Sequence, residues 1–206
     1  MDSLSFANLT SMAVEGVPFS DPDGRFSLVI PAGSTVLTAD SAQEEINQAR
    51  TAYLAANETG ADKLFDDCLN NALTENSVVI LAQDQQVIIE ISALPDAAPG
   101  KLTPDQMAEL AEPIREMLSE SYDAVLLLNT KDRALISGRE HSWLTYWLRS
   151  GEADAQLDVI AAVLDDNWLY EVDIYTHNGN QAQRMLWHAF ITQTLHYTPL
   201  QNALDE

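Results

Sequence analysis

The segment 141–176 reads HSWLTYWLRSGEADAQLDVIAAVLDDNWLYEVDIYT and decides the fold class. It contains three runs rich in aromatic and branched apolar residues, His141 to Arg149, Gln156 to Leu164 and Trp168 to Thr176. Turn-forming residues separate the runs, Ser150-Gly151 in one place and Asp165-Asp166-Asn167 in the other. Parallel neighbours need a crossover of about a dozen residues or more, and these connections are shorter. The segment therefore predicts three antiparallel strands.

Six further runs of strand-forming residues precede this segment. Valine and isoleucine dominate two of them, Ser77 to Gln83 and Gln86 to Ala93, as is typical of a pleated surface. Asp84-Gln85 predicts a short turn between these two, so they should form a hairpin. The remaining four are Arg25 to Pro31, Thr35 to Thr38, Asp123 to Asn129 and Ala134 to Gly138.

Two helices are predicted ahead of the Val/Ile-rich hairpin. The capping-box pattern of Asp40 and Gln43 marks the start of the first, and Gly60 ends it. The second begins near Ala61 and places apolar residues along one face. That stripe consists of Leu64, Phe65, Cys68, Leu69, Ala72 and Leu73. Cys68 lies within the stripe, so we expect a buried thiol that packs as a small apolar group.

Two more helices are predicted in the second half of the chain. Thr103-Pro104-Asp105-Gln106 is a strong helix start, with a cap at Thr103 and a proline in the first turn. Pro113 lacks a backbone donor and should kink or split that helix. The final helix runs from Gln181 to His196 and is largely apolar. Its polar stripe comprises Gln181, Arg184, His188 and Thr192.

The order of these elements indicates an α+β fold with an antiparallel β-sheet flanked by helices. Helices grouped between runs of strands argue against a doubly wound nucleotide-binding sheet. The length of 206 residues suits one well-filled core. We therefore expect a single domain over 1–206, with a loosely ordered N-terminal segment over 1–18.

The opening strand carries an aromatic residue near its start and a proline at its end, in Gly24-Arg25-Phe26-Ser27-Leu28-Val29-Ile30-Pro31. A hairpin from Leu157 to Thr176 and a final helix close the chain. In these features the sequence resembles the PsbP-like family, which includes the DcrB-related proteins. The resemblance covers 24–199, and two features depart from the pattern: the long insertion Ser41 to Glu75 and the acidic surface. It implies a PsbP-like α/β/α sandwich and an accessory, adaptor or chaperone-like role, with no shared catalytic residues.

The charge of the chain restricts the classes of partner. Thirty-two acidic residues against 10 basic ones give a formal net charge of −22. That field repels nucleic acid and anionic membrane surfaces. No apolar run approaches the ~20 residues that cross a bilayer, so membrane insertion is not expected. A protein partner is expected instead, and the sequence leaves its identity and the oligomeric state open.

The N-terminus and the cysteine content bear on location. The opening sequence MDSLSFANLT lacks the basic and apolar regions of a secretory signal. Cys68 is the one cysteine, so no internal disulfide can form and no cysteine-based zinc site can be built. We expect a cytoplasmic protein, and an exported surface protein or lipoprotein domain whose signal has been removed is the alternative.

The sequence contains none of the common catalytic or phosphate-binding motifs. We expect no catalytic residue, cofactor or metal, and read Asp21-Pro22-Asp23-Gly24 as a turn because its spacing does not fit a calcium loop. The chain is therefore expected not to be an enzyme. The alternative is an uncharacterised hydrolase that uses acidic residues with His141 or His177.

The aromatic residues of the late strands are the candidate partner-binding site. Trp143 and Trp147 fall on one face of a predicted strand, and Trp168 and Tyr170 lie in the last strand. A central strand covered on both faces would bury them. A partly open face would instead present them to a partner. On the second reading, the protein is a non-catalytic interaction, adaptor or chaperone-like module that binds through these four residues.

Overall fold

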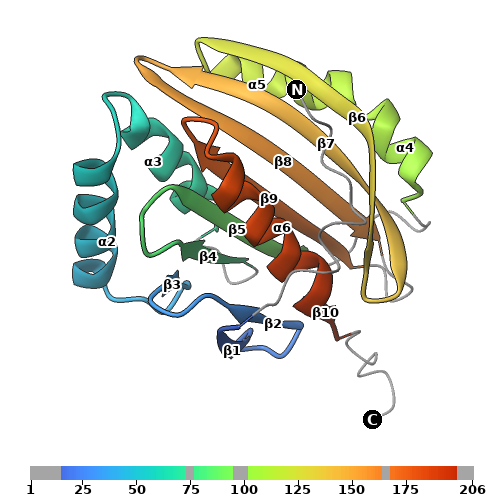
Figure 1. The fold of residues 1–206 in the computed structure, drawn as a ribbon, viewed down its shortest axis with the longest axis horizontal. Helices are drawn as coiled ribbons and strands as arrows, with labels where there is room; N and C mark the ends of the chain where they lie inside the picture. Colours follow the sequence, from blue (N-terminus) through green and yellow to red (C-terminus); the bar gives the residue numbers. More distant parts are fainter. Residues whose placement is uncertain (1–14, 73–76, 95–101, 164–167, 199–206) are drawn as a thin grey trace.

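The computed structural model describes residues 15–72, 77–94, 102–163 and 168–198, and its largest element is a seven-stranded sheet (Figure 1). The strand order is β3-β4-β5-β9-β8-β7-β6, and each neighbouring pair is antiparallel. The strands are β3 (Thr35–Leu37), β4 (Ser77–Leu81), β5 (Val87–Leu94), β6 (Ala124–Ile136), β7 (Arg139–Ser150), β8 (Ala153–Val163) and β9 (Leu169–His177). The predicted antiparallel sheet is confirmed.

The three strands predicted from segment 141–176 are β7, β8 and β9, and they pair in sequence order. Ser150 lies opposite Ala153, so the connection at Ser150-Gly151 is a tight turn. Gly151 has a φ of 60°, a left-handed conformation that glycine adopts without strain. The second predicted turn, Asp165-Asp166-Asn167, lies outside the described residues.

The edge strand β6 corrects the prediction of two separate strands over Asp123 to Asn129 and Ala134 to Gly138. It is continuous, and its pairing with β7 shifts register between Leu127 and Asn129 and again between Asn129 and Asp132. A bulge places an extra residue in one strand and bends that strand. The polar residues that interrupt the apolar pattern are thus accommodated in bulges rather than in a loop.

A three-stranded sheet is formed by β1 (Val17–Ser20), β2 (Phe26–Ile30) and β10 (His196–Tyr197), in the order β1-β2-β10. The expected loose segment over 1–18 is wrong for Val17 and Pro18, because both belong to β1, whereas 1–14 lie outside the described residues. Strand β1 forms because it pairs with β2. Its own residues are mostly exposed and show no alternation of apolar and polar side chains. The first two strands predicted from the sequence correspond to β2 and β3, and these belong to different sheets.

Helices cover both faces of the large sheet (Figure 1). On one face lie α2 (Gln43–Ala56), α3 (Ala61–Ala72), α4 (Pro104–Glu109) and α5 (Ala111–Ser121); α6 (Gln181–Thr194) and the small sheet lie on the other. Alternation along β5 separates the two cores. Ile88 packs in the cluster of Tyr53 and Phe65 on the first face. Its neighbour Ile89 packs with Trp187 on the second.

The helix ends test the predicted caps. Thr103 Oγ1 accepts the backbone N–H of Gln106 at 3.3 Å, and the Gln106 side chain accepts the Thr103 N–H at 2.9 Å, so this capping box is confirmed. Pro113 splits the helix as expected, because α4 and α5 meet at Leu110 and Pro113 lies in the first turn of α5. The predicted cap at Asp40 is wrong, since α2 has its N-cap at Ala42.

Candidate interaction surface

The four predicted partner-binding residues occupy two different environments. Trp143 has no exposed surface, and its ring lies under α6 with its centroid 3.8 Å from that of His188. Tyr170 is also fully buried, and its ring lies tilted against that of Tyr197 with the two centroids 4.6 Å apart. Trp168 is partly exposed beside this tyrosine pair, and Trp147 is partly exposed on β7. Trp143 and Tyr170 therefore have no exposed area to offer a partner, and of this set only Trp147 and Trp168 are partly exposed.

Leucines of the edge strand extend the surface around Trp147. Leu126 lies directly opposite Trp147 across the β6–β7 ladder and is 56% exposed. Leu128 is the extra residue where the register shifts between Leu127 and Asn129, and it is 55% exposed. Residues directly opposite in an antiparallel pair project from the same face of the sheet. We call Leu126, Leu128 and Trp147 the apolar edge.

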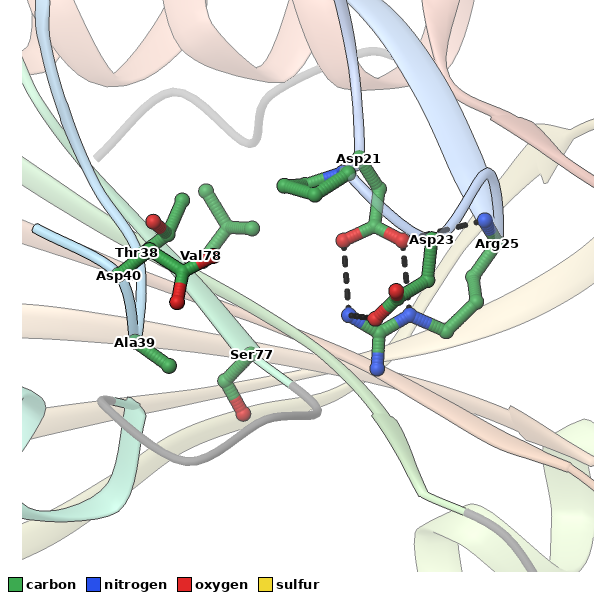
Figure 2. Close-up of a pocket in the computed structure, with 9 residues that line it drawn as sticks. Asp21, Asp23, Arg25, Thr38, Ala39, Asp40, Ser77 and Val78 are labelled. Carbon is green, nitrogen blue, oxygen red and sulfur yellow. Dashed lines mark hydrogen bonds and ion pairs between the residues drawn. The ribbon is translucent and has the colours of Figure 1, made fainter.

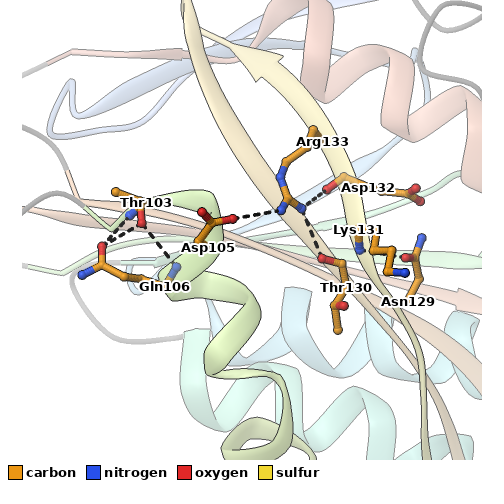
Figure 3. A network of polar contacts seen from close by, with 8 residues as sticks. All are labelled: Thr103, Asp105, Gln106, Asn129, Thr130, Lys131, Asp132 and Arg133. Atoms are coloured by element: carbon orange, nitrogen blue, oxygen red, sulfur yellow. Dashed lines mark hydrogen bonds and ion pairs between the residues drawn. The ribbon is translucent and has the colours of Figure 1, made fainter.

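The two halves of β6, the strand at the end of the seven-stranded order, differ in how they are protected from pairing with another strand. The second half carries Lys131, Asp132 and Arg133, and Figure 3 shows how polar contacts hold these residues. Asn129 Oδ1 accepts the Lys131 N–H at 2.8 Å. Arg133 donates to the Thr130 and Asp132 carbonyls at 3.2 and 3.1 Å and reaches Asp105 of α4 at 3.8 Å. The first half, Ala124 to Leu128, reads AVLLL and contains no charge.

A buried ion pair joins α6 to the middle of the sheet. Arg184 Nε and Nη2 each donate to the Asp158 carboxylate at 2.7 Å. His188 Nε2 lies 2.8 Å from the same carboxylate, and Thr145 Oγ1 donates to it at 2.7 Å. Burial alone would raise the pKa of Asp158, but His188 and Arg184 outweigh that effect and hold it well below its usual range. Burial lowers the pKa of His188, and the contact with Asp158 opposes this shift.

An acidic cluster lies on the opposite face, under α3. Glu90 is 8% exposed and lies opposite Asp173, and Glu171 lies opposite Ser92. Burial raises the pKa of Glu90 to about 7, although a 3.2 Å hydrogen bond from Ser92 opposes this shift. Burial, together with Glu171 and Glu90, raises the pKa of Asp173. Repulsion and burial thus favour protonated carboxyls here.

A cavity of about 210 Å³ lies between the turn after β1 and the end of β3 (Figure 2). The side chain of Arg25 lines this cavity. It binds Asp21 through two contacts of 2.7 and 2.8 Å and Asp23 through a third of 3.2 Å. Asp21 also accepts the backbone N–H of Arg25 at 3.1 Å. Asp21-Pro22-Asp23-Gly24 is the predicted turn, with Gly24 at a φ of 72°. The carboxylates of this turn therefore hold an arginine of the same chain.

The candidate hydrolase residues are buried and lie in separate places. His141 is 2% exposed, and its Nδ1 lies 2.9 Å from the Arg139 carbonyl. His177 is 1% exposed, bonds to the Tyr53 hydroxyl, and has its pKa lowered to about 4 by burial. Cys68 is 1% exposed, and burial raises the pKa of its thiol. Within the described ranges, no group of three His, Cys, Asp or Glu side chains is placed to hold a metal ion.

Two features of the sequence point to the apolar edge when they are taken together. One is the run of five apolar residues from Ala124 to Leu128, a pattern that by itself is typical of a buried strand. The charged residues at 131–133 follow in the same strand, and such charges are typical of a sheet edge. Combining the two signals would have identified a strand with one unprotected half.

In the part of the chain that the structure describes, no helix is long and apolar enough to span a membrane.

Comparison with known proteins agrees with this architecture. No protein-family model and no curated protein sequence matches the chain. Among solved structures, the cyanobacterial PsbP (CyanoP) of Synechocystis matches 91% of this chain and 99% of its own, at 12% identity and a TM-score of 0.53. The Ran-binding protein Mog1p of Saccharomyces cerevisiae matches 90% and 96%, at 10% identity and a TM-score of 0.50. The chain therefore has a PsbP-like fold.

Proposed function

We propose that the protein is a non-catalytic interaction module that binds another protein through the apolar edge. The observation that carries this proposal is the pair of leucines on β6, each more than half exposed, of which Leu126 lies directly opposite Trp147 at the end of the sheet formed by the described residues. Scattered apolar residues are common on surfaces, but a contiguous group around an aromatic residue is typical of a binding site. Trp168 remains a second, separate contact in this proposal.

The charge of the chain supports a protein as the partner. A net charge of −22 disfavours nucleic acid and anionic lipid surfaces. A PsbP-like fold is compatible with this role, since Mog1p is a Ran-binding protein. Fold alone does not define a partner, so the proposal rests on the apolar edge.

The buried positions of the histidines favour this role over the hydrolase alternative. Burial lowers the pKa of both His141 and His177, and their partners are a backbone carbonyl and a tyrosine hydroxyl. A general base needs contact with the group whose proton it removes. We also propose that the chain forms a single domain and that the protein is cytoplasmic. The free thiol of Cys68 fits a reducing compartment.

The test separates surface residues from core residues. We would replace Leu126 and Leu128 together with serine, and measure stability and the proteins captured from the source cells. Exposed positions tolerate such changes within about 0.5 kcal/mol, so the variant should keep its unfolding midpoint and lose its partner. Capture of the same proteins in undiminished amounts by this stable variant would contradict the proposal.

Two tryptophan variants supply the matched control. Trp143→Ala removes a fully buried side chain and should cost about 3–5 kcal/mol of stability. Trp147→Ala, on the same strand, should cost less and should weaken partner capture. An equal loss of stability in both variants would show that Trp147 belongs to the core, and the surface would then be reduced to the leucines.

A further inference from the structure

We propose that the partner binds as an extended segment that adds a strand to the outer side of β6, with apolar and basic residues alternating along it. This inference rests on the proposed function and specifies the conformation and chemistry of the partner. The stretch that receives the segment is Ala124 to Leu128.

The backbone of this stretch is available for pairing. Within the described residues β6 pairs with β7 alone and forms one end of the seven-stranded order. Alternate residues of an edge strand direct their N–H and C=O groups outward, where another strand can bind them. Bulges and charges protect an edge, and in β6 these begin after Leu127 and at Lys131. The residues ahead of the first bulge, Ala124 to Leu127, are therefore the part of β6 best suited to strand addition, and Leu128 lies at the end of this stretch.

One face of the added strand would meet the apolar edge. A partner residue opposite Leu126 projects from the same face as Leu126, in a row with Trp147. Leu126 and Leu128 are 56% and 55% exposed, so contact there removes apolar surface from water. Every second residue of the partner should therefore be apolar.

The other face of the added strand would meet acidic side chains. Helix α5 packs on β6 from the side opposite α6, as Figure 1 shows. Glu116 and Glu120 are exposed and lie in the last two turns of α5. Basic side chains at the intervening positions of the partner would approach these carboxylates. This complementarity also disfavours a second copy of the chain, because two edges with the same acids, each in a chain of charge −22, repel each other.

A defined peptide tests the inference. The probe is a capped nine-residue peptide of alternating valine and lysine, added to the full chain. We would measure its affinity by fluorescence anisotropy and the hydrogen exchange of the backbone amides in 124–128. Binding should slow exchange at alternate residues of that stretch. Replacing lysine with glutamate in the peptide should abolish binding.

Variants of the chain locate the site. Leu126→Lys places a charge on the open half of β6 and should abolish binding. Leu135→Lys is the matched control, because Leu135 is 65% exposed on the same strand but lies beyond the charged stretch, and it should bind as the wild type does. Replacing Glu116 and Glu120 together with glutamine should weaken binding about three- to tenfold, as expected for two exposed ion pairs.

Four results would overturn the inference. They are binding without protection of 124–128, equal loss of binding in Leu126→Lys and Leu135→Lys, failure of the peptide to bind, and slow exchange of these amides in the free chain. The last would mean that this chain or a second copy already pairs with the edge. If the peptide fails while the serine variant of Leu126 and Leu128 still loses its natural partner, the proposed function stands and only the binding mode is wrong.

Discussion

Replacing Asp158 with asparagine removes the negative charge at the centre of the contact between α6 and the sheet. In the wild type, the carboxylate of Asp158 receives hydrogen bonds of 2.7 to 2.8 Å from Thr145, Arg184 and His188. Asparagine has nearly the same shape, so the packing changes little. Its amide group, however, places a donor against neighbours that are themselves donors.

The expected loss of stability follows from burial. Asp158 is 0% exposed and Arg184 is 6% exposed, so the variant leaves a guanidinium in the interior without its counter-charge. Breaking one partner of a buried pair costs about 3–5 kcal/mol, and we expect a loss in this range. Adding Arg184→Met should recover part of the loss, because the unpaired charge is then removed.

A second ion pair of the same geometry is the control. Arg50 binds Asp66 through two contacts of 2.8 Å, but these side chains are 37% and 43% exposed. Asp66→Asn makes the same chemical change in water, where such pairs contribute little. Urea denaturation at pH 7 measures each loss. Equal losses in Asp158→Asn and Asp66→Asn would refute the argument that burial sets the cost.

Three further changes test other parts of the structure. Burial raises the pKa of Glu90 from 4.5 to about 7, so between these pH values the folded chain holds a proton that the unfolded chain releases. The free energy of unfolding should therefore fall by about 3 kcal/mol as pH rises from 4.5 to 7. Glu90→Gln should flatten this part of the profile measured by urea denaturation, and an unchanged slope would rule Glu90 out as its source. Cys68 should react slowly with a thiol reagent in the native state and quickly after denaturation, and fast native labelling would contradict its burial. In Gly60→Ala the new Cβ would lie 2.0 Å from the Ser150 carbonyl oxygen. Gly138 also has a positive φ but has open space around it, so thermal unfolding should show a larger loss of stability in Gly60→Ala than in Gly138→Ala. Equal losses of stability would leave backbone conformation as the main cost.

Local patterns in the sequence determined most of the strands and helices. Alternating apolar residues and turn chemistry act over a few residues, so β7, β8 and β9 and the turn at Ser150-Gly151 could be predicted. The Thr103 cap and the split at Pro113 could be predicted for the same reason. The failures at β1 and β6 are also local in origin: β1 carries little apolar alternation and is held by β2, and the bulges of β6 resemble a loop in sequence.

The tertiary structure alone decided which of these residues reach the surface. Trp143 and Trp147 lie on one face of one strand, and the sequence gives them the same environment. Helix α6 covers Trp143, whereas Trp147, four residues along the same strand, remains partly exposed. Asp158 and Arg184, which are 26 residues apart, become partners for the same reason, because α6 packs across β8. Periodicity defines the face of an element, but only the packing of elements distant in sequence determines what covers that face.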